Sequence, residues 1–155
     1  MKVAIGEDSH RFDFEDKNKK LILGGVLFTT YPPLAGNSDA DVVLHAITNA
    51  ISGITGKNIL GKIADKMCME QGITDSKEYV REALKYLSHP IEHLSISIEC
   101  KTPKISPRIE EMKEEIAKLL KISATDIGIT ATTGEELTEV GKGRGIHVFA
   151  CITVA

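Results

Sequence analysis

Three positions combine side-chain types and spacing that suit a metal site. Asp8 and His10 lie two residues apart in a segment that opens with the alternation of Val3 and Ile5. Because side chains two apart on a strand leave the same face, this carboxylate and imidazole can converge on one ion. With His45 as a third ligand, the set suits Zn²⁺ with its fourth position open. The residues alone leave two alternatives, a zinc site and a set of solvated polar side chains.

The segment that carries His45 is predicted to be a helix from Ser38 to Ile54, with capping residues at Asn37 to Asp39. Its apolar stripe places His45 nearly opposite the main buried face. One turn earlier, Asp41 is expected to orient the imidazole as an outer partner. The predicted helix N-terminus and the loop before it would also present backbone N–H groups to a phosphate.

Two further segments offer polar chemistry. Thr132, Thr133 and Glu135 supply hydroxyls and a carboxylate, a set that suits phosphate oxygens and a hard cation such as Mg²⁺. The glycine-rich string from Val140 to Gly145 lacks the GK[ST] ending of a P-loop and precedes a predicted strand, so a simple turn and an anion contact both remain open for it.

The elements that must position these groups follow from periodicity. Alternating apolar residues predict strands over 3–10, 94–100, 127–131 and 146–154, and a strand over 21–28 that two glycines interrupt. Helices are predicted over 38–54, over 75–86 with Asp75 or Ser76 as cap, and over 106–120 with Ser106 as cap before Pro107. Residues 56–73 are predicted to form loop and a short helix. This alternation predicts a layered α/β (α+β) fold in which helices pack on one face of a mixed β-sheet.

Composition limits the function classes. A chain of 155 residues predicts one domain over residues 1–155, and 42% hydrophobic with 26% charged residues is typical of a globular protein. The formal net charge of -3 disfavours nucleic acid as a partner. The sequence shows no apolar run of about 20 residues and no signal-like start, which predicts a cytoplasmic protein with no membrane partner.

The cysteine pattern argues against two other kinds of site. Cys68, Cys100 and Cys151 are odd in number, widely spaced and outside any CxxC pair. This pattern disfavours both a disulfide framework and a thiolate zinc site. We expect all three to be small buried apolar residues.

Four segments, GEDSHRF, GNSDADVVLHA, CKTPKISP and ATTGEELTEVGKGRGI, occur in this order along the whole chain. Together they resemble the 2-C-methyl-D-erythritol 2,4-cyclodiphosphate synthases, and the DxH and SDxDVxxHA motifs at this spacing favour the metal-site alternative. The resemblance implies an α/β homotrimer with active sites between neighbouring subunits. It also implies conversion of 4-diphosphocytidyl-2-C-methyl-D-erythritol 2-phosphate into the cyclic diphosphate and CMP, a step of non-mevalonate isoprenoid biosynthesis.

The resemblance also implies site roles. One Zn²⁺ per subunit would be held by Asp8, His10 and His45, and Glu135 would help to hold Mg²⁺ or Mn²⁺ on the diphosphate. Thr133 and Glu135 would complete the catalytic set. Substrate would be bound by Asn37, Ser38, Cys100, Pro103, Lys104, Ile105, Ser106, Ala131, Thr132 and Thr133. The cytidylyltransferase of the pathway is a possible partner.

The chain departs from the family pattern at several positions. Asn37 stands where a histidine usually precedes SDxD, Asn58 replaces an acidic residue, and residues 64–69 replace an FPDTDP loop. These departures motivate one alternative, a trimer that binds zinc and a cytidine nucleotide, or docks on the cytidylyltransferase of the pathway, with little turnover. A second alternative, a zinc phosphodiesterase that uses water in place of the substrate's own phosphate, fits the metal site equally well. The retention of all three metal ligands and of Glu135 favours the active synthase.

Overall fold

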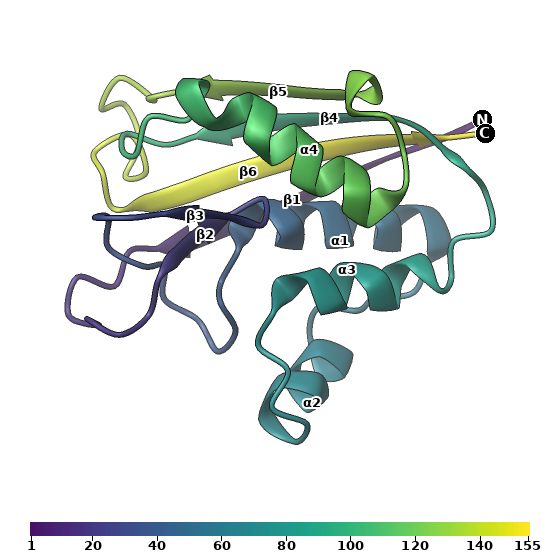
Figure 1. The fold of residues 1–155 in the computed structure, drawn as a ribbon, viewed down its shortest axis with the longest axis horizontal. Coiled ribbons are helices and arrows are strands. Elements are labelled where there is room, and N and C mark those ends of the chain that lie inside the picture. Colours follow the sequence, from purple (N-terminus) through teal and green to yellow (C-terminus); the bar gives the residue numbers. More distant parts are fainter.

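The computed structural model describes residues 1–155, and its four-stranded sheet carries helices on one face (Figure 1). The elements in chain order are β1 (Lys2–Arg11), β2 (Leu21–Leu23), β3 (Val26–Phe28), α1 (Val42–Thr55), α2 (Lys62–Met69), α3 (Ser76–Leu84), β4 (Ile91–Glu99), α4 (Ile109–Leu120), β5 (Ile127–Thr132) and β6 (Gly145–Val154). Short 3₁₀ turns, Ser106–Arg108 and Ala124–Asp126, precede α4 and β5. The predicted mixed sheet with helices on one face is confirmed.

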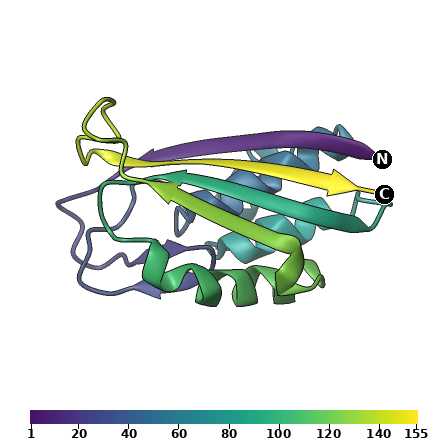
Figure 2. The same ribbon diagram turned by 90° about the horizontal axis from the view of Figure 1, so that it is seen from above.

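The strand order places the polar strand ends at one end of the sheet. The order is β1-β6-β4-β5, with β4 and β5 parallel and the other neighbours antiparallel, as Figure 2 shows. Four residues lie side by side on neighbouring strands: Ser9 pairs with His147, His147 with Glu99, and Glu99 with Thr132. Strands β1 and β5 nevertheless lie at opposite edges, three strand spacings or about 14 Å apart.

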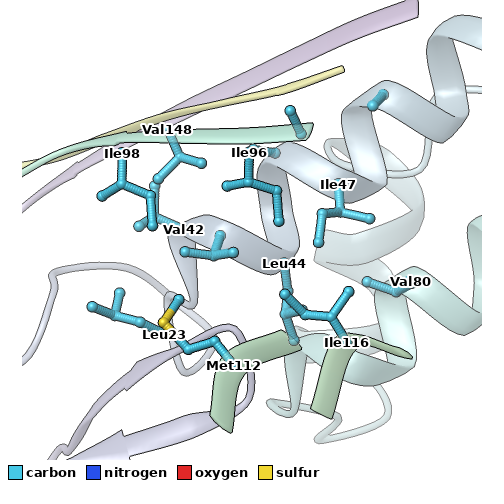
Figure 3. Packing of buried hydrophobic residues seen from close by; sticks show 14 of the residues in the cluster. Leu23, Val42, Leu44, Ile47, Val80, Ile96, Ile98, Met112, Ile116 and Val148 are labelled. Carbon is cyan, nitrogen blue, oxygen red and sulfur yellow. The ribbon is translucent and has the colours of Figure 1, made fainter. Parts of the chain in front are cut away.

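The core lies between the sheet and the helices. Ile96 and Ile98 of β4 and Val148 of β6 point inward and pack near Val42 and Ile47 of α1 (Figure 3). Every second residue of these strands faces the helices, so apolar and polar residues alternate in the sequence and predict the strands. No helix of the structure is long and apolar enough to cross a membrane.

The outer face of the sheet has no helix over it. In Figure 1, α1 and α3 lie below the sheet, and nothing covers its upper side. Three large apolar side chains are exposed there: Val3 and Ile5 of β1, at 59% and 68%, and Phe149 of β6, at 47%. Several apolar side chains gathered on one open sheet face are typical of an interaction surface.

Strand β1 and helix α1 approach each other unusually closely. A Cβ atom at Gly6 would lie 2.2 Å from both the Ala46 carbonyl oxygen and the Ala50 nitrogen. Only glycine permits this contact, because it has no side chain to separate the two backbones. The contact fixes the distance between the residues that follow Gly6 on β1 and the residues near Ala46 on α1.

The predicted start of α1 is wrong by four residues. The helix begins at Val42, and its N-cap is Asp41, whose side chain accepts from the Leu44 N–H. Residues 38–41 are not helical, so no helix N-terminus lies at Ser38 for a phosphate. The predicted position of His45 is wrong as well: the residue is only 7% exposed. Because α1 contacts β1 and β6 as well as α3, it is buried on more than one face, and an amphipathic stripe does not locate its free side.

Three smaller predictions also need correction. Ser106 does not cap a helix with its side chain, because residues Ser106–Arg108 form a 3₁₀ turn before α4. Cys100 is buried as expected, but Cys68 and Cys151 are only partly buried. The helix predicted to reach Tyr86 ends at Leu84, while its predicted cap at Asp75 is confirmed by a bond from the Lys77 N–H.

Candidate metal centre

Three possible ligand atoms from β1 and α1 lie close enough together to bind one ion. Asp8 Oδ2 lies 2.9 Å from His10 Nε2 and 3.1 Å from His45 Nδ1, and the two nitrogens are 3.3 Å apart. Zinc with tetrahedral bonds of about 2.0–2.1 Å separates its ligand atoms by about 3.3 Å. The three atoms therefore fit a single divalent ion, and the geometry favours the metal-site alternative over solvated side chains.

The charge state of these groups suits a cation. Burial alone would raise the pKa of Asp8, but hydrogen bonds with His10 and His45 outweigh burial and hold that pKa well below its ordinary value. Burial alone would lower the pKa of His10, but the hydrogen bond with Asp8 and its negative charge outweigh burial and raise that pKa. The carboxylate at the centre is therefore anionic across the neutral range, as a ligand must be.

The far nitrogen of each imidazole contacts the protein. His10 Nδ1 lies 2.7 Å from the Ala35 carbonyl oxygen, which can only accept, so this nitrogen carries a proton. His45 Nε2 lies 2.9 Å from the Ser76 hydroxyl at the start of α3. Such outer contacts orient metal-binding histidines and fix their tautomers.

Asp41 has a different role from the one its spacing predicts. Its carboxylate accepts from the N–H groups of Gly24 and Gly25 in the β2–β3 turn, and from that of Leu44. It makes no hydrogen bond with the imidazole of His45. Burial, followed by the nearby charge of Asp39, raises the pKa of Asp41 to about 6. Asp41 therefore joins the β2–β3 hairpin to α1 and does not orient the metal ligand.

A cavity of about 350 Å³ opens beside the three ligands. Its wall is formed by Asp8, His10, Gly36, Asn37, Ser38, His45, Leu60, Gly61, Ala64, Asp65, Cys68 and Tyr79. Asn37 and Ser38, predicted from the resemblance to contact substrate, thus lie next to the metal ligands. Asp65 and Cys68 of this wall belong to α2, which includes residues 64–69, the segment that departs from the family pattern.

The predicted cytidine-binding residues form a second cluster. Residues 100–106 follow β4 and residues 131–133 end β5, and the two segments are joined by a bond of 2.9 Å from the Cys100 N–H to the Thr132 oxygen. Lys104 and Ser106 are exposed, as are Ala131 and Thr133. These segments therefore offer a surface of backbone and polar groups at one edge of the sheet.

Three residues of this second cluster point into the protein. Cys100, Pro103 and Ile105 are buried, so they shape the loop and offer no exposed side chain. The Cys100 thiol donates to the Thr102 oxygen at 2.8 Å, and burial raises the pKa of Cys100 to about 12. A thiol held in its protonated form is not a nucleophile.

Within one chain the two clusters do not meet. None of residues 100–106 or 131–135 lines the metal cavity. Glu135 is exposed in the loop after β5, where its N–H donates to the Thr133 hydroxyl at 3.3 Å. Asp8 and His10 on the edge strand β1 are thus separated by β6 from the residues assigned to the nucleotide, which follow β4 and end β5.

Sequence reasoning missed three residues around the metal centre. Ser76 was assigned only as a helix cap, Asp39 only as a cap of α1, and Cys68 only as a core residue. In the structure Ser76 and Asp39 contact each other behind His45, and Cys68 lines the cavity. Residue type alone gives no signal for Ser76 or Cys68, while Asp39 could have been singled out by its place within the SDAD motif.

The fold and this centre define a class, the small mixed-sheet α/β enzymes that bind a divalent metal through one carboxylate and two imidazoles. The chain belongs to the YgbB family, whose sequence model matches residues 1–155. A 2-C-methyl-D-erythritol 2,4-cyclodiphosphate synthase of Chlamydia muridarum is 46% identical over 155 residues, which are 99% of this chain and 87% of that protein. The predicted family is confirmed.

Solved structures show the same fold. The bifunctional IspDF from Campylobacter jejuni has a TM-score of 0.85 and 27% identity, and the similarity covers 97% of this chain but only 41% of that one. IspF of Plasmodium falciparum, solved as a CDP complex, has a TM-score of 0.82 and 27% identity over 98% of this chain and 94% of that chain.

Proposed function

We propose that this chain is an active synthase that cyclises 4-diphosphocytidyl-2-C-methyl-D-erythritol 2-phosphate to 2-C-methyl-D-erythritol 2,4-cyclodiphosphate and releases CMP. The observation that carries the proposal is the convergence of Asp8, His10 and His45 to within 3.3 Å of one another. It occurs in a chain that is 46% identical to a synthase of this name over almost its whole length. A single domain of residues 1–155 would carry the activity.

In this reaction the main task of the protein is to position the 2-phosphate of the substrate against its diphosphate. An oxygen of the substrate's own 2-phosphate attacks the β-phosphorus, the bond from that phosphorus to the oxygen bridging it to the α-phosphate breaks, and CMP leaves with its electron pair. Because nucleophile and electrophile belong to one molecule, holding them in line supplies much of the rate. No general base is required, because the attacking 2-phosphate is already an anion at neutral pH.

The residues of the metal cavity would hold the reacting end of the substrate. Asp8, His10 and His45 would hold Zn²⁺, which when bound supplies Lewis-acid stabilisation of phosphate charge. Asn37 and Ser38 line the same cavity and offer an amide and a hydroxyl as hydrogen-bond donors to phosphate oxygens. Asn37 carries no charge, so its contribution is a neutral hydrogen bond, weaker than a charged one.

The second cluster, residues 100–106 and 131–133, would hold the nucleotide. These residues would bind cytosine and the cytidine phosphates, with Lys104 as the cation. Glu135 would help to hold Mg²⁺ or Mn²⁺ on the diphosphate. Because none of these residues lines the metal cavity of the same chain, we infer a homotrimer in which the two clusters of neighbouring subunits face each other. The exposed Val3, Ile5 and Phe149 on the open sheet face support burial of that face between subunits.

Product analysis tests the proposal. The purified protein is incubated with the cytidylated 2-phosphate, Zn²⁺ and Mg²⁺, and products are followed by ³¹P NMR. Equal amounts of CMP and cyclic diphosphate are expected. An open-chain phosphate product would indicate a zinc phosphodiesterase, and binding without turnover would indicate a nucleotide-binding protein; either result contradicts the proposal.

A pair of lysine variants tests the nucleotide cluster. Lys104→Ala should raise KM by roughly 10-fold with a smaller change in kcat, because a ground-state phosphate contact is lost. Lys118→Ala is the matched control, since Lys118 pairs with Glu115 on the surface of α4 and should leave both constants within about twofold. Equal effects of the two variants would remove Lys104 from the site.

A complex with the cytidylyltransferase of the pathway is a further part of the proposal. It is supported by the Campylobacter jejuni protein, which is described as bifunctional. Co-elution of the two purified proteins in size-exclusion chromatography is expected, and independent elution at micromolar concentrations would contradict it.

A further inference from the structure

The side of His45 that faces away from the metal ligands is held by a buried serine. His45 Nε2 lies 2.9 Å from the hydroxyl of Ser76, and Ser76 is 0% exposed. His45 belongs to α1 and Ser76 is the first residue of α3, so this contact joins two helices behind the metal centre. The hydroxyl of Ser38 is also near Nε2, but at 3.4 Å, and it already accepts from the Ala40 N–H.

The Ser76 hydroxyl donates its proton in a hydrogen bond to the carboxylate of Asp39. Asp39 Oδ1 accepts from this hydroxyl and from the Asp41 N–H, and Asp39 Oδ2 accepts from the Ser76 N–H. An ionised carboxylate only accepts hydrogen bonds, so the single hydroxyl proton points to Asp39. The Ser76 oxygen then presents a lone pair to His45, and the proton between them must be on Nε2.

This proton assignment decides which atom of His45 is available to a metal. With the proton on Nε2, the neutral imidazole keeps a lone pair on Nδ1, the nitrogen that lies 3.1 Å from Asp8 Oδ2 in the ligand cluster. Asp8 favours the opposite tautomer when no ion is bound, because its oxygen attracts an N–H at Nδ1. A metal ion would then have to displace that proton before binding.

We propose that Ser76 and Asp39 are positioning residues that hold His45 in the tautomer with a free lone pair on Nδ1, and so strengthen metal binding. The inference rests on the metal site of the proposed function, and it adds two residues that touch neither ion nor substrate. The chain runs from Asp39 through Ser76 to His45, and removal of either outer member shifts the balance toward the tautomer that Asp8 favours. Loss of such outer partners weakens metal affinity by roughly 10- to 100-fold.

Two variants separate this role from general stability. Ser76→Ala removes the hydroxyl from a fully buried position without adding volume. Asp39→Asn keeps the shape but replaces one acceptor oxygen with an NH₂ donor. With its NH₂ toward the serine oxygen, it turns the hydroxyl proton toward Nε2 and favours the wrong tautomer. Ser52→Ala is the matched control, because Ser52 is a buried serine of α1 whose hydroxyl has no partner.

The test is a titration of the full-length protein with Co²⁺ and with Zn²⁺ in competition with a chelator. Ser76→Ala and Asp39→Asn should bind either ion about 10- to 100-fold more weakly than the wild type, and Ser52→Ala should stay within about twofold. In the metal-free protein, ¹⁵N shifts of His45 should show a smaller Nε2–H population in both variants. Thermal unfolding of each variant confirms that it is folded.

Three results would overturn the inference. Unchanged affinity in Ser76→Ala and Asp39→Asn would remove any effect on the metal. Weaker affinity with an unchanged His45 tautomer would show a structural role only. A wild-type protein that binds neither ion would refute the metal site itself, and with it the proposed function, whereas the first two results leave the proposed function intact.

Discussion

A methyl group at Gly6 would separate the two elements that build the metal centre. In Gly6→Ala the new Cβ would fall 2.2 Å from the Ala46 oxygen, and an ordinary contact is about 3.4 Å. Relief of the clash therefore requires β1 and α1 to separate by about 1.2 Å. His45 precedes Ala46, so a rigid shift of α1 directly away from β1 lengthens its 3.1 Å distance to Asp8 to at most about 4.3 Å. Two ligands of a zinc ion with bonds of about 2.0–2.1 Å do not span that distance.

The stability effect follows from the same contact. Overpacking typically costs about 1–3 kcal/mol, and the upper end applies to Gly6→Ala because the contacted atoms are backbone. For a chain of 155 residues, about 3 kcal/mol corresponds to a fall in Tm of roughly 6–12 °C. Zinc affinity should fall by more than the roughly 10- to 100-fold that follows from loss of an outer partner, since one of three ligands is withdrawn.

Calorimetry and a zinc titration against a chromophoric chelator measure both quantities. Gly128→Ala is the control: it lies on β5 of the same sheet, and a Cβ there meets nothing within 4 Å. Its Tm should stay the same or rise slightly, because alanine reduces the freedom of the unfolded chain. If Gly6→Ala kept wild-type Tm and zinc affinity, the argument that this close approach sets the metal geometry would be wrong.

Two other predictions concern metal removal and Asp41. Chelation should lower Tm by roughly 5–11 °C relative to protein with zinc at 100 times its Kd, since binding then adds about 2.7 kcal/mol; His45→Ala should abolish this difference in a thermal scan. Asp41→Ala should cost about 3–5 kcal/mol in urea unfolding, because a cap is lost and the N–H groups of Gly24 and Gly25 lose their acceptor. The exposed cap variant Asp75→Ala should cost only about 1 kcal/mol, and equal losses would show that the hairpin bonds contribute nothing.

Local patterns in the sequence predicted most elements of the fold. The strands that contain Ile96, Ile129 and Ile152 were found because each has one face on the helices and one face open, which produces strict alternation. The start of α1 could not be found in this way. Ser38, Asp39 and Asp41 are all capping types, and the choice of Asp41 depends on Gly24 and Gly25, which tertiary structure brings to it.

Some features of the candidate site could likewise be predicted from the sequence, and others could not. Asp8 and His10 could be paired from sequence, because a strand fixes the direction of residues two apart. The burial of His45 could not be predicted, since it depends on α3 packing against α1. Nor could the contact with Ser76, which lies 31 residues from His45 in sequence and only 2.9 Å away in space.

The sequence by itself determined the ligand types, the strand that carries two of them and the family, because these depend on residue identity and on spacing within one element. Only the tertiary structure decided that His45 lies within reach of Asp8 and His10, and that Ser76 and Asp39 contact its other side. It also decided that residues 100–106 and 131–133 are separated from β1 by strand β6. Each of these depends on how separate elements pack. The contact at Gly6 illustrates the reason: a distance between two backbones is set by side chains, or by their absence, on both elements at once.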